Sequence, residues 1–140
     1  MKKFFVLADD DIDDAELFSD ALAEIDPAVD FIHIDDCRTL LKYLGNCENK
    51  KPDIIFLDIN MPEMNGWECL VELKKHAENK EIPVIMYSTS SIRRDKEMAV
   101  ELQALGFLTK PSDFRVLVKT LTTIAQARDF IDLRKVLQIL

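Results

Sequence analysis

The stretch KPDIIFLDINMPEMNGWE, residues 51–68, places an apolar run at positions 54–57 directly before Asp58. A continuous apolar run of this length is typical of a strand that is buried on both faces, as in a parallel sheet covered by helices. The Asn65-Gly66 pair that follows is a strong turn signal. A carboxylate at the end of a buried strand costs free energy unless an opposite charge meets it. Asp58 therefore predicts a cationic partner elsewhere in the chain.

The rest of the chain alternates between strand-like and helical patterns. Short apolar runs predict five strands, at residues 4–8, 31–34, 54–57, 84–87 and 107–109. Apolar residues at helical spacing predict five helices, at residues 15–25, 40–44, 67–77, 98–105 and 114–124. This alternation predicts an α/β protein of the doubly wound, flavodoxin-like (βα)5 type. The expected five-stranded parallel sheet has strand order 2-1-3-4-5 and helices on both faces.

Length and charge narrow the class of function. The chain has 140 residues, and 48% of them are hydrophobic, which is enough for one packed domain. The net charge of -8 argues against a nucleic-acid partner or an anionic membrane surface. No apolar run approaches the ~20 residues of a spanning helix, and the early acidic residues do not resemble a signal peptide. We therefore expect a cytoplasmic protein.

The cysteines and histidines carry no recognisable site. Cys37, Cys47 and Cys69 lack the spacing of a metal site or a redox motif, so we expect three reduced thiols. His33 alternates with apolar residues in a predicted strand, and His76 falls near the end of a predicted helix. Neither histidine has an adjacent carboxylate pattern, and we expect no catalytic role for either.

Chemically active side chains stand where the predicted strands end. They are Asp9 and Asp10 after the first strand, Asp58 after the third, Ser88 after the fourth and Lys110 after the fifth. Singly, each is typical of a turn or a helix cap. The carboxyl ends of parallel strands meet at one edge of the sheet, however, and three carboxylates brought together there repel unless a cation joins them. Oxygen ligands favour Mg2+ or Mn2+.

Such a set of groups suits phosphoryl transfer. The carboxylate of Asp58 is a competent nucleophile toward phosphorus and would give an aspartyl phosphate. The metal would touch Asp10, Asp58 and the backbone carbonyl of Asn60. Lys110 and Ser88 would stabilise the remaining phosphoryl oxygens, which carry the charge in the transition state.

Four segments, FVLADDD, IIFLDINMPEMNG, PVIMYSTS and FLTKP, resemble in this order the signature blocks of the receiver domain of two-component response regulators. The resemblance covers about residues 4–125. It implies that Asp58 accepts a phosphoryl group from a histidine kinase or a histidine phosphotransfer protein. It also implies that Asp9 and Asp10 bind Mg2+.

The same resemblance assigns roles at the fourth and fifth strands. It implies that Ser88 is the switch hydroxyl, that Lys110 binds the phosphoryl group and that Phe107 is the switch aromatic. Four positions depart from the family pattern. Ser88 replaces the more frequent Thr, and Thr89 replaces the usual Ala or Gly and shares the switch position. Phe107 replaces Tyr, and Gln103 replaces the usual glycine before the fifth strand.

Two functions follow as the main alternatives, and the complete acidic set with Ser88 and Lys110 argues against a third, a degenerate receiver that acts as a constitutive binding module. The first is a stand-alone phosphorelay or two-component signalling protein without enzymatic output, which contacts an unknown downstream effector when phosphorylated. Its receiver domain would span residues 1–127, with residues 128–140 as a helical extension of that domain. The second is a haloacid-dehalogenase-like phosphohydrolase with an aspartyl-phosphate intermediate. Such enzymes favour a second Asp two residues after the nucleophile, and Asn60 at that position cannot act as the acid.

The tail carries an apolar stripe of its own. It consists of Phe130, Leu133, Leu137 and Leu140, at helical spacing. Arg128 falls where the stripe of the preceding helix would continue, so a separate short helix is expected. This helix either folds back on its own domain or forms part of a homodimer or partner surface with the fourth and fifth helices.

Overall fold

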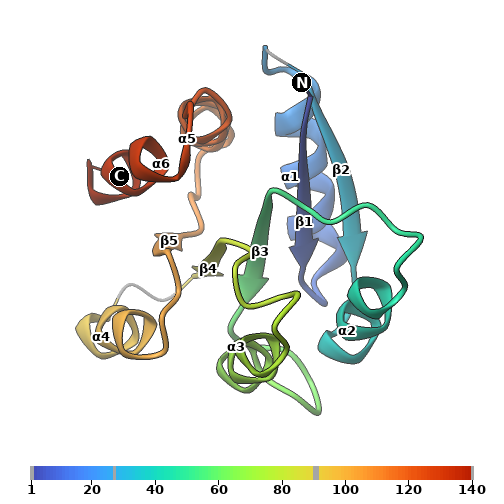
Figure 1. Cartoon of the computed structure of the whole chain (residues 1–140). Helices are drawn as coiled ribbons and strands as arrows, with labels where there is room; N and C mark the ends of the chain where they lie inside the picture. Colours follow the sequence, from blue (N-terminus) through green and yellow to red (C-terminus); the bar gives the residue numbers. More distant parts are fainter. Residues whose placement is uncertain (1, 27, 90–91, 140) are drawn as a thin grey trace.

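The sheet of the computed structural model has five parallel strands in the order β2-β1-β3-β4-β5 (Figure 1). The structure describes residues 2–26, 28–89 and 92–139. The strands are β1 (Lys3–Ala8), β2 (Val29–Ile34), β3 (Ile54–Asp58), β4 (Val84–Ser88) and β5 (Gly106–Thr109). The helices are α1 (Ile12–Ala23), α2 (Cys37–Gly45), α3 (Gly66–Lys75), α4 (Arg93–Glu101), α5 (Phe114–Ala125) and α6 (Phe130–Ile139). The predicted fold class and strand order are confirmed.

Helices cover both faces of the sheet, as Figure 1 shows. Alternate residues of β3 divide between two cores: Phe56 faces the side of α1, α5 and α6, whereas Ile55 and Leu57 face α2, α3 and α4. All three side chains are fully buried. The unbroken apolar run at residues 54–57 therefore exists because this strand has no solvated face.

The loop after β3 is held tightly against the sheet. Asn65 caps α3, because its side chain accepts from the backbone N–H of Glu68 while the Glu68 side chain accepts from that of Asn65. Gly66 then lies so close to β3 that a Cβ atom there would collide with the backbone carbonyl oxygen of Asp58. Only glycine lets α3 begin at this point, directly behind Asp58.

Helix α4 differs from its prediction. The expected helix reached residue 105, but α4 spans Arg93–Glu101 and ends at the cap residue Leu102. The next residue, Gln103, has a left-handed backbone with φ 66°. A left-handed residue cannot continue a right-handed helix, so Leu105 lies in the connection to β5.

The expectation of three free thiols is wrong for Cys37 and Cys69, which form a disulfide with a Cα–Cα distance of 5.8 Å. The two cysteines are separated by 32 residues in the sequence. They meet because α2 and α3 pack side by side on one face of the sheet. Cys47 is exposed and free.

The tail forms α6, which packs against β5 and α5 of its own chain. Leu133 and Leu137 are buried in the core on the α1–α5 side. Phe130, which shares the predicted stripe, is instead 50% exposed, and Leu140 lies outside the described residues. The approach is close at Gly106, where a Cβ atom would lie 2.8 Å from Cδ1 of Leu137. None of the described helices has the length and apolar character needed to cross a membrane.

Candidate functional site

Three carboxylates meet where β1 and β3 end. Asp9 and Asp10 follow β1, and Asp58 is the last residue of β3, which pairs directly with β1. One oxygen atom from each carboxylate lies within 4.8 Å of the others. Asp9 and Asp58 are buried, with exposed fractions of 0% and 5%, whereas Asp10 is exposed. So much negative charge in one place favours a cation there.

Lys110, which follows β5, reaches this cluster over the end of β4. Its Nζ atom lies 2.8 Å from an oxygen of Asp9, 2.8 Å from an oxygen of Asp14 and 3.4 Å from Oδ1 of Asp58. The same Nζ lies 5.4 Å from the centre of the Tyr87 ring. The cation that Asp58 requires is therefore present, but it is shared among three carboxylates.

The electrostatics of the cluster make Asp58 hold its proton unusually well. Burial raises the pKa of Asp58 from an ordinary value of 3.8 to about 6, the charge of Asp9 adds to the rise, and Lys110 opposes it. Burial alone would lower the pKa of Lys110, but hydrogen bonds to Asp14 and Asp9 outweigh burial and raise it above its ordinary value. Lys110 thus stays charged at neutral pH.

Asp9 is held in place through both its side chain and its backbone. Its carboxylate accepts from the backbone N–H of Asp11 at 2.9 Å, and its carbonyl oxygen lies 2.7 Å from Nε2 of His33. Asp11 in turn caps α1 by accepting from the backbone N–H of Asp14. This chain of contacts sets the first turn of α1 over the cluster and brings the Asp14 side chain to Lys110.

The other predicted site residues lie around the cluster rather than in it. Ser88 is buried at the end of β4, one residue beyond Tyr87, which pairs with Asp58. Thr89 follows it and is exposed. Asn60 is exposed in the loop after β3. Phe107, on β5, is half-buried and packs toward the α4 side of the sheet.

Sequence reasoning missed Asp14 and Tyr87. Asp14 lies in the first turn of α1, so its position near the cluster could have been inferred from a helix beginning at Ile12. The predicted helix began only at Ala15. Tyr87 lies inside an apolar run, and no pattern in the sequence distinguishes it from a core residue.

The donor set fits a hard divalent cation. Asp9, Asp10 and Asp58 offer only carboxylate oxygens, the ligands that Mg2+ and Mn2+ prefer. Asp10 is exposed, so water molecules can complete the coordination sphere. With Lys110 on one side, the arrangement can hold a metal and an anion next to the same buried carboxylate.

Comparison with known proteins assigns the class. Residues 5–122 match the model of the response regulator receiver domain, and the chain belongs to this family. Receiver domains accept a phosphoryl group, bind Mg2+ or Mn2+ at an acidic pocket, and interact with histidine kinases and phosphotransfer proteins.

Individual relatives differ in length. The chain is 31% identical over 121 residues to the response regulator Rcp1 of Synechocystis sp., an alignment that covers 84% of this chain and 82% of Rcp1. It is 39% identical over 75 residues to protein PilH of Pseudomonas aeruginosa, covering 54% of this chain and 62% of PilH. It spans only 27% of a protein-glutamate methylesterase/protein-glutamine glutaminase of Treponema denticola, at 38% identity over 104 residues and 72% of this chain.

Solved structures share the fold. The Mn2+-bound form of Rcp1 has a TM-score of 0.75 at 29% identity, covering 87% of this chain and 91% of that one. The phosphorylated cyanobacterial phytochrome response regulator RcpA has a TM-score of 0.79 at 30% identity, covering 89% of this chain and 91% of that one.

Proposed function

We propose that this protein is a cytoplasmic response regulator that accepts a phosphoryl group on Asp58 and signals by a protein contact that depends on phosphorylation. The observation that carries the proposal is the buried Asp58 carboxylate with Lys110 Nζ at 3.4 Å and two further carboxylates beside it. The donor would be a histidine kinase or a histidine phosphotransfer protein. The similar structure of Rcp1 with Mn2+ supports the binding of a divalent cation, and that of phosphorylated RcpA supports phosphoryl acceptance.

In the proposed reaction, an oxygen of Asp58 attacks phosphorus as the bond between phosphorus and the donor histidine nitrogen breaks, and the nitrogen keeps the electron pair. A divalent cation held by Asp9, Asp10, Asp58 and the backbone carbonyl of Asn60 would supply positive charge to the phosphoryl oxygens. The rigid end of β3 orients the nucleophile. The burial of Asp58 keeps bulk water from the reacting carboxylate.

Two side chains would bind the product and transmit its presence. Lys110 lies near enough to Asp58 to pair with a phosphoryl oxygen after a small movement away from Asp14. Ser88 would donate its hydroxyl to another oxygen, with Thr89 beside it. The shift of β4 and β5 toward the phosphoryl group would then reposition Phe107, which lacks the hydroxyl of a tyrosine and responds by packing alone.

The experiment that tests the acceptor is mass spectrometry of the protein after treatment with acetyl phosphate and Mg2+. Wild type should gain one phosphoryl group, and Asp58→Asn should gain none. Asp35→Asn is the matched control, because Asp35 also follows a strand but is exposed and outside the cluster. An unchanged adduct in Asp58→Asn would refute the assignment.

A Lys110→Ala variant, treated in the same way, tests the role of Lys110. Lys110→Ala should still accept some phosphoryl group but should lose the binding of the effector that phosphorylation induces, because the ammonium is the link between Asp58 and β5. We further propose that the protein has no separate enzymatic turnover. Sustained hydrolysis of phosphomonoesters would contradict this and would favour the phosphohydrolase alternative.

A further inference from the structure

The disulfide between Cys37 and Cys69 joins the first turns of α2 and α3, which begin at the same end of the sheet as the acidic cluster. Cys37 is the first residue of α2, and Cys69 lies in the first turn of α3. Their exposed fractions are 1% and 0%, so the bond is buried in the core that the two helices share with the sheet.

One end of the disulfide is coupled to Asp58. Cys69 lies on α3, which begins at Gly66. The N–H of Gly66 donates to the carbonyl oxygen of Ile59 at 2.8 Å, and a Cβ atom at Gly66 would lie 2.3 Å from the carbonyl oxygen of Asp58. The start of α3 is thus in direct contact with the backbone of Asp58. Because protein interiors are close-packed, a displacement of Cys69 is passed on to the end of β3.

The other end of the disulfide is coupled to Asp9. Cys37 follows Asp36, whose side chain caps α2 by accepting from the backbone N–H of Thr39 at 2.8 Å. Two residues before this cap, the carbonyl oxygen of Ile34 accepts from the N–H of Asp9 at 3.0 Å. The disulfide therefore ties together the two backbone segments that carry the buried carboxylates of the acidic cluster.

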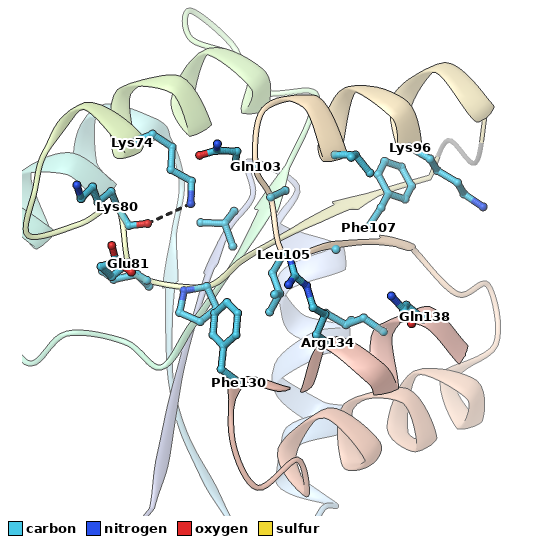
Figure 2. Close-up of a pocket in the computed structure, with 17 residues that line it drawn as sticks. Lys74, Lys80, Glu81, Lys96, Gln103, Leu105, Phe107, Phe130, Arg134 and Gln138 are labelled. Carbon is cyan, nitrogen blue, oxygen red and sulfur yellow. Dashed lines mark hydrogen bonds between the residues drawn. The ribbon is translucent and has the colours of Figure 1, made fainter. Parts of the chain in front are cut away.

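The opposite end of α3 is held in place. Lys74 extends from α3, and its Nζ atom donates to the backbone carbonyl of Lys80 at 3.1 Å, as Figure 2 shows. This contact attaches the last turn of α3 to the connection that leads into β4. A change in the separation of α2 and α3 should therefore move the first turn of α3, beside Asp58, more than its last turn.

Reduction changes the room that the two sulfur atoms need. Two thiol groups stay farther apart than two bonded sulfur atoms, and both side chains are enclosed in a close-packed core. A core without spare volume responds to such crowding by shifting the backbone. The first turns of α2 and α3 should therefore separate on reduction, and the backbones of Asp9 and Asp58 should move with them.

The bond is buried but stands at a helix end. Cys37 is the first residue of α2, and helix termini open locally at a much lower cost in free energy than the core does. Such an opening would admit a small thiol or disulfide without unfolding the sheet. In the cytoplasm, the location proposed above, disulfides are usually transient and serve catalysis or redox sensing.

We propose that Cys37 and Cys69 form a reversible redox site that controls how readily Asp58 accepts a phosphoryl group. The disulfide form is the more reactive one, because the three carboxylates of the cluster meet within 4.8 Å of one another in this form. The inference rests on the proposed function, since it regulates the same acceptor.

The oxidant is a low-molecular-weight disulfide such as oxidised glutathione. The thiolate of one cysteine attacks a sulfur atom of the oxidant, whose S–S bond breaks and releases one thiolate. The thiolate of the other cysteine then attacks the protein sulfur of this mixed disulfide and releases the second thiolate. The two electrons and the two protons that the protein loses thus end on two molecules of the reduced, low-molecular-weight thiol. Reduction of the site is the reverse sequence.

The redox site is tested by equilibrating the protein in buffers with different ratios of reduced to oxidised glutathione. The protein carries Cys47→Ser, which removes the exposed thiol. Trp67, the only tryptophan, lies two residues before Cys69 on α3, and its fluorescence reports the state of the pair. We expect one reversible transition in buffers that contain both forms, with two alkylated cysteines in mass spectra of the reduced protein and none in the oxidised protein. A pair that stays oxidised in fully reduced glutathione, or that never forms the disulfide, would overturn the proposal.

The coupling to the cluster is tested by NMR spectra of the two forms. The amide resonances of Asp9, Ile59 and Gly66 should differ between the oxidised and the reduced protein. The amide of Leu121, in the core on the other face of the sheet, should not. Unchanged resonances at the first three positions would show that the disulfide is not coupled to the cluster.

The effect on the reaction is tested with acetyl phosphate and Mg2+, followed by mass spectrometry. The reduced form should gain the phosphoryl group more slowly than the oxidised form, by about threefold or more, because its nucleophile is less well positioned. The matched control Cys37→Ala/Cys69→Ala, also with Cys47→Ser, should react at the same rate in both buffers.

Two results of this experiment would contradict the proposal. One is an equal rate for the two redox forms. The other is a reduced form that no longer unfolds cooperatively in urea, because the disulfide would then be a structural link only. If neither form gains a phosphoryl group although the amide resonances change as expected, Asp58 fails as the acceptor while the redox coupling to the cluster stands. Failure of the proposed function is thus distinguishable from failure of the redox site.

Discussion

Lys110 is bonded to Asp14 as closely as it is to Asp9: in both cases the distance from Nζ to the carboxylate oxygen is 2.8 Å, against 3.4 Å to Asp58. Asp14 belongs to α1, and its side chain is 31% exposed, whereas that of Asp9 is fully buried. Asp14 is therefore the more accessible of the two close partners of Lys110. The cation beside Asp58 is thus held partly by a residue outside the acidic cluster. In the proposed reaction, Asp14 would compete with a phosphoryl group on Asp58 for the same ammonium.

Replacing Asp14 should favour the phosphorylated state. Asp14→Asn keeps the size of the side chain but releases Lys110 toward Asp58, and a partly buried ion pair of about 1 kcal/mol corresponds to roughly fivefold in an equilibrium. We expect a higher steady-state fraction of phosphorylated protein at a fixed, subsaturating concentration of acetyl phosphate, measured by mass spectrometry. Asp13→Asn, on the same turn but exposed, is the control. Equal occupancy in the two variants would show that Asp14 does not compete.

Asp58 should destabilise the metal-free protein at neutral pH. Its pKa is raised from 3.8 to about 6 by burial and by the charge of Asp9, so the folded state binds the proton more tightly than the unfolded chain does. Stability is therefore highest below the unfolded pKa and falls as pH rises toward 6, by about 3 kcal/mol at most. Asp58→Asn, which carries no charge, should avoid this loss.

Urea unfolding in the presence of a chelator measures the effect. Asp58→Asn should be more stable than wild type at about pH 8 and should lose that advantage at about pH 4. Adding Mg2+ at the higher pH should narrow the difference, because the metal binds the carboxylate of wild type. A constant difference at both pH values would mean that the charge of Asp58 is not the cause.

The sequence was sufficient to predict a residue's place in the fold where that place depends on its neighbours along the chain. The apolar run before Asp58 predicted a buried central strand, and the strand ends predicted that Asp9, Asp10, Asp58 and Lys110 would meet. The missed contact of Asp14 and the disulfide depend on where helices lie against each other or against the sheet. Asp14 reaches Lys110 because α1, capped by Asp11, begins at Ile12, three residues before the predicted start.

The disulfide and the tail show the same limit. Cys37 and Cys69 belong to different helices, and only the packing of α2 on α3 brings them together. In the tail, helical spacing marked Phe130 and Leu137 equally, yet Leu137 is buried beside Gly106 and Phe130 is 50% exposed. Periodicity identifies an apolar face but not the surface that covers it.

Thr89 should prolong the life of the phosphoryl group. It is exposed directly after Ser88, where a branched side chain would crowd the water that attacks the acyl phosphate. Thr89→Ala should shorten the phosphoryl lifetime by about threefold, or roughly 0.7 kcal/mol in activation free energy. Thr89→Val keeps the branch without the hydroxyl and should decay like wild type. Decay in Thr89→Ala that is equal to or slower than wild type would count against the steric explanation.

Gln103 should be a strained position. Its φ of 66° is left-handed, a conformation that costs a residue with a Cβ atom about 1–2 kcal/mol, while glycine adopts it freely. After the entropy that glycine loses on folding, Gln103→Gly should stabilise the protein by up to about 1 kcal/mol in urea unfolding. Gln126→Gly is the control, because Gln126 has φ -83° and should lose stability instead. A loss in both variants would show that the backbone at Gln103 carries no strain.

Leu137 should attach α6 to its own domain. It is 9% exposed and contacts the backbone at Gly106, so Leu137→Ala would leave a cavity and cost about 2–4 kcal/mol of unfolding free energy. Ile131→Ala, at a position on the same helix that is 66% exposed, should cost less than about 0.5 kcal/mol. Both values come from urea unfolding, with light scattering on the same samples. If the two substitutions had equal small effects on stability while Leu137→Ala lowered the molecular mass, the apolar face of α6 would belong to a homodimer interface rather than to the core.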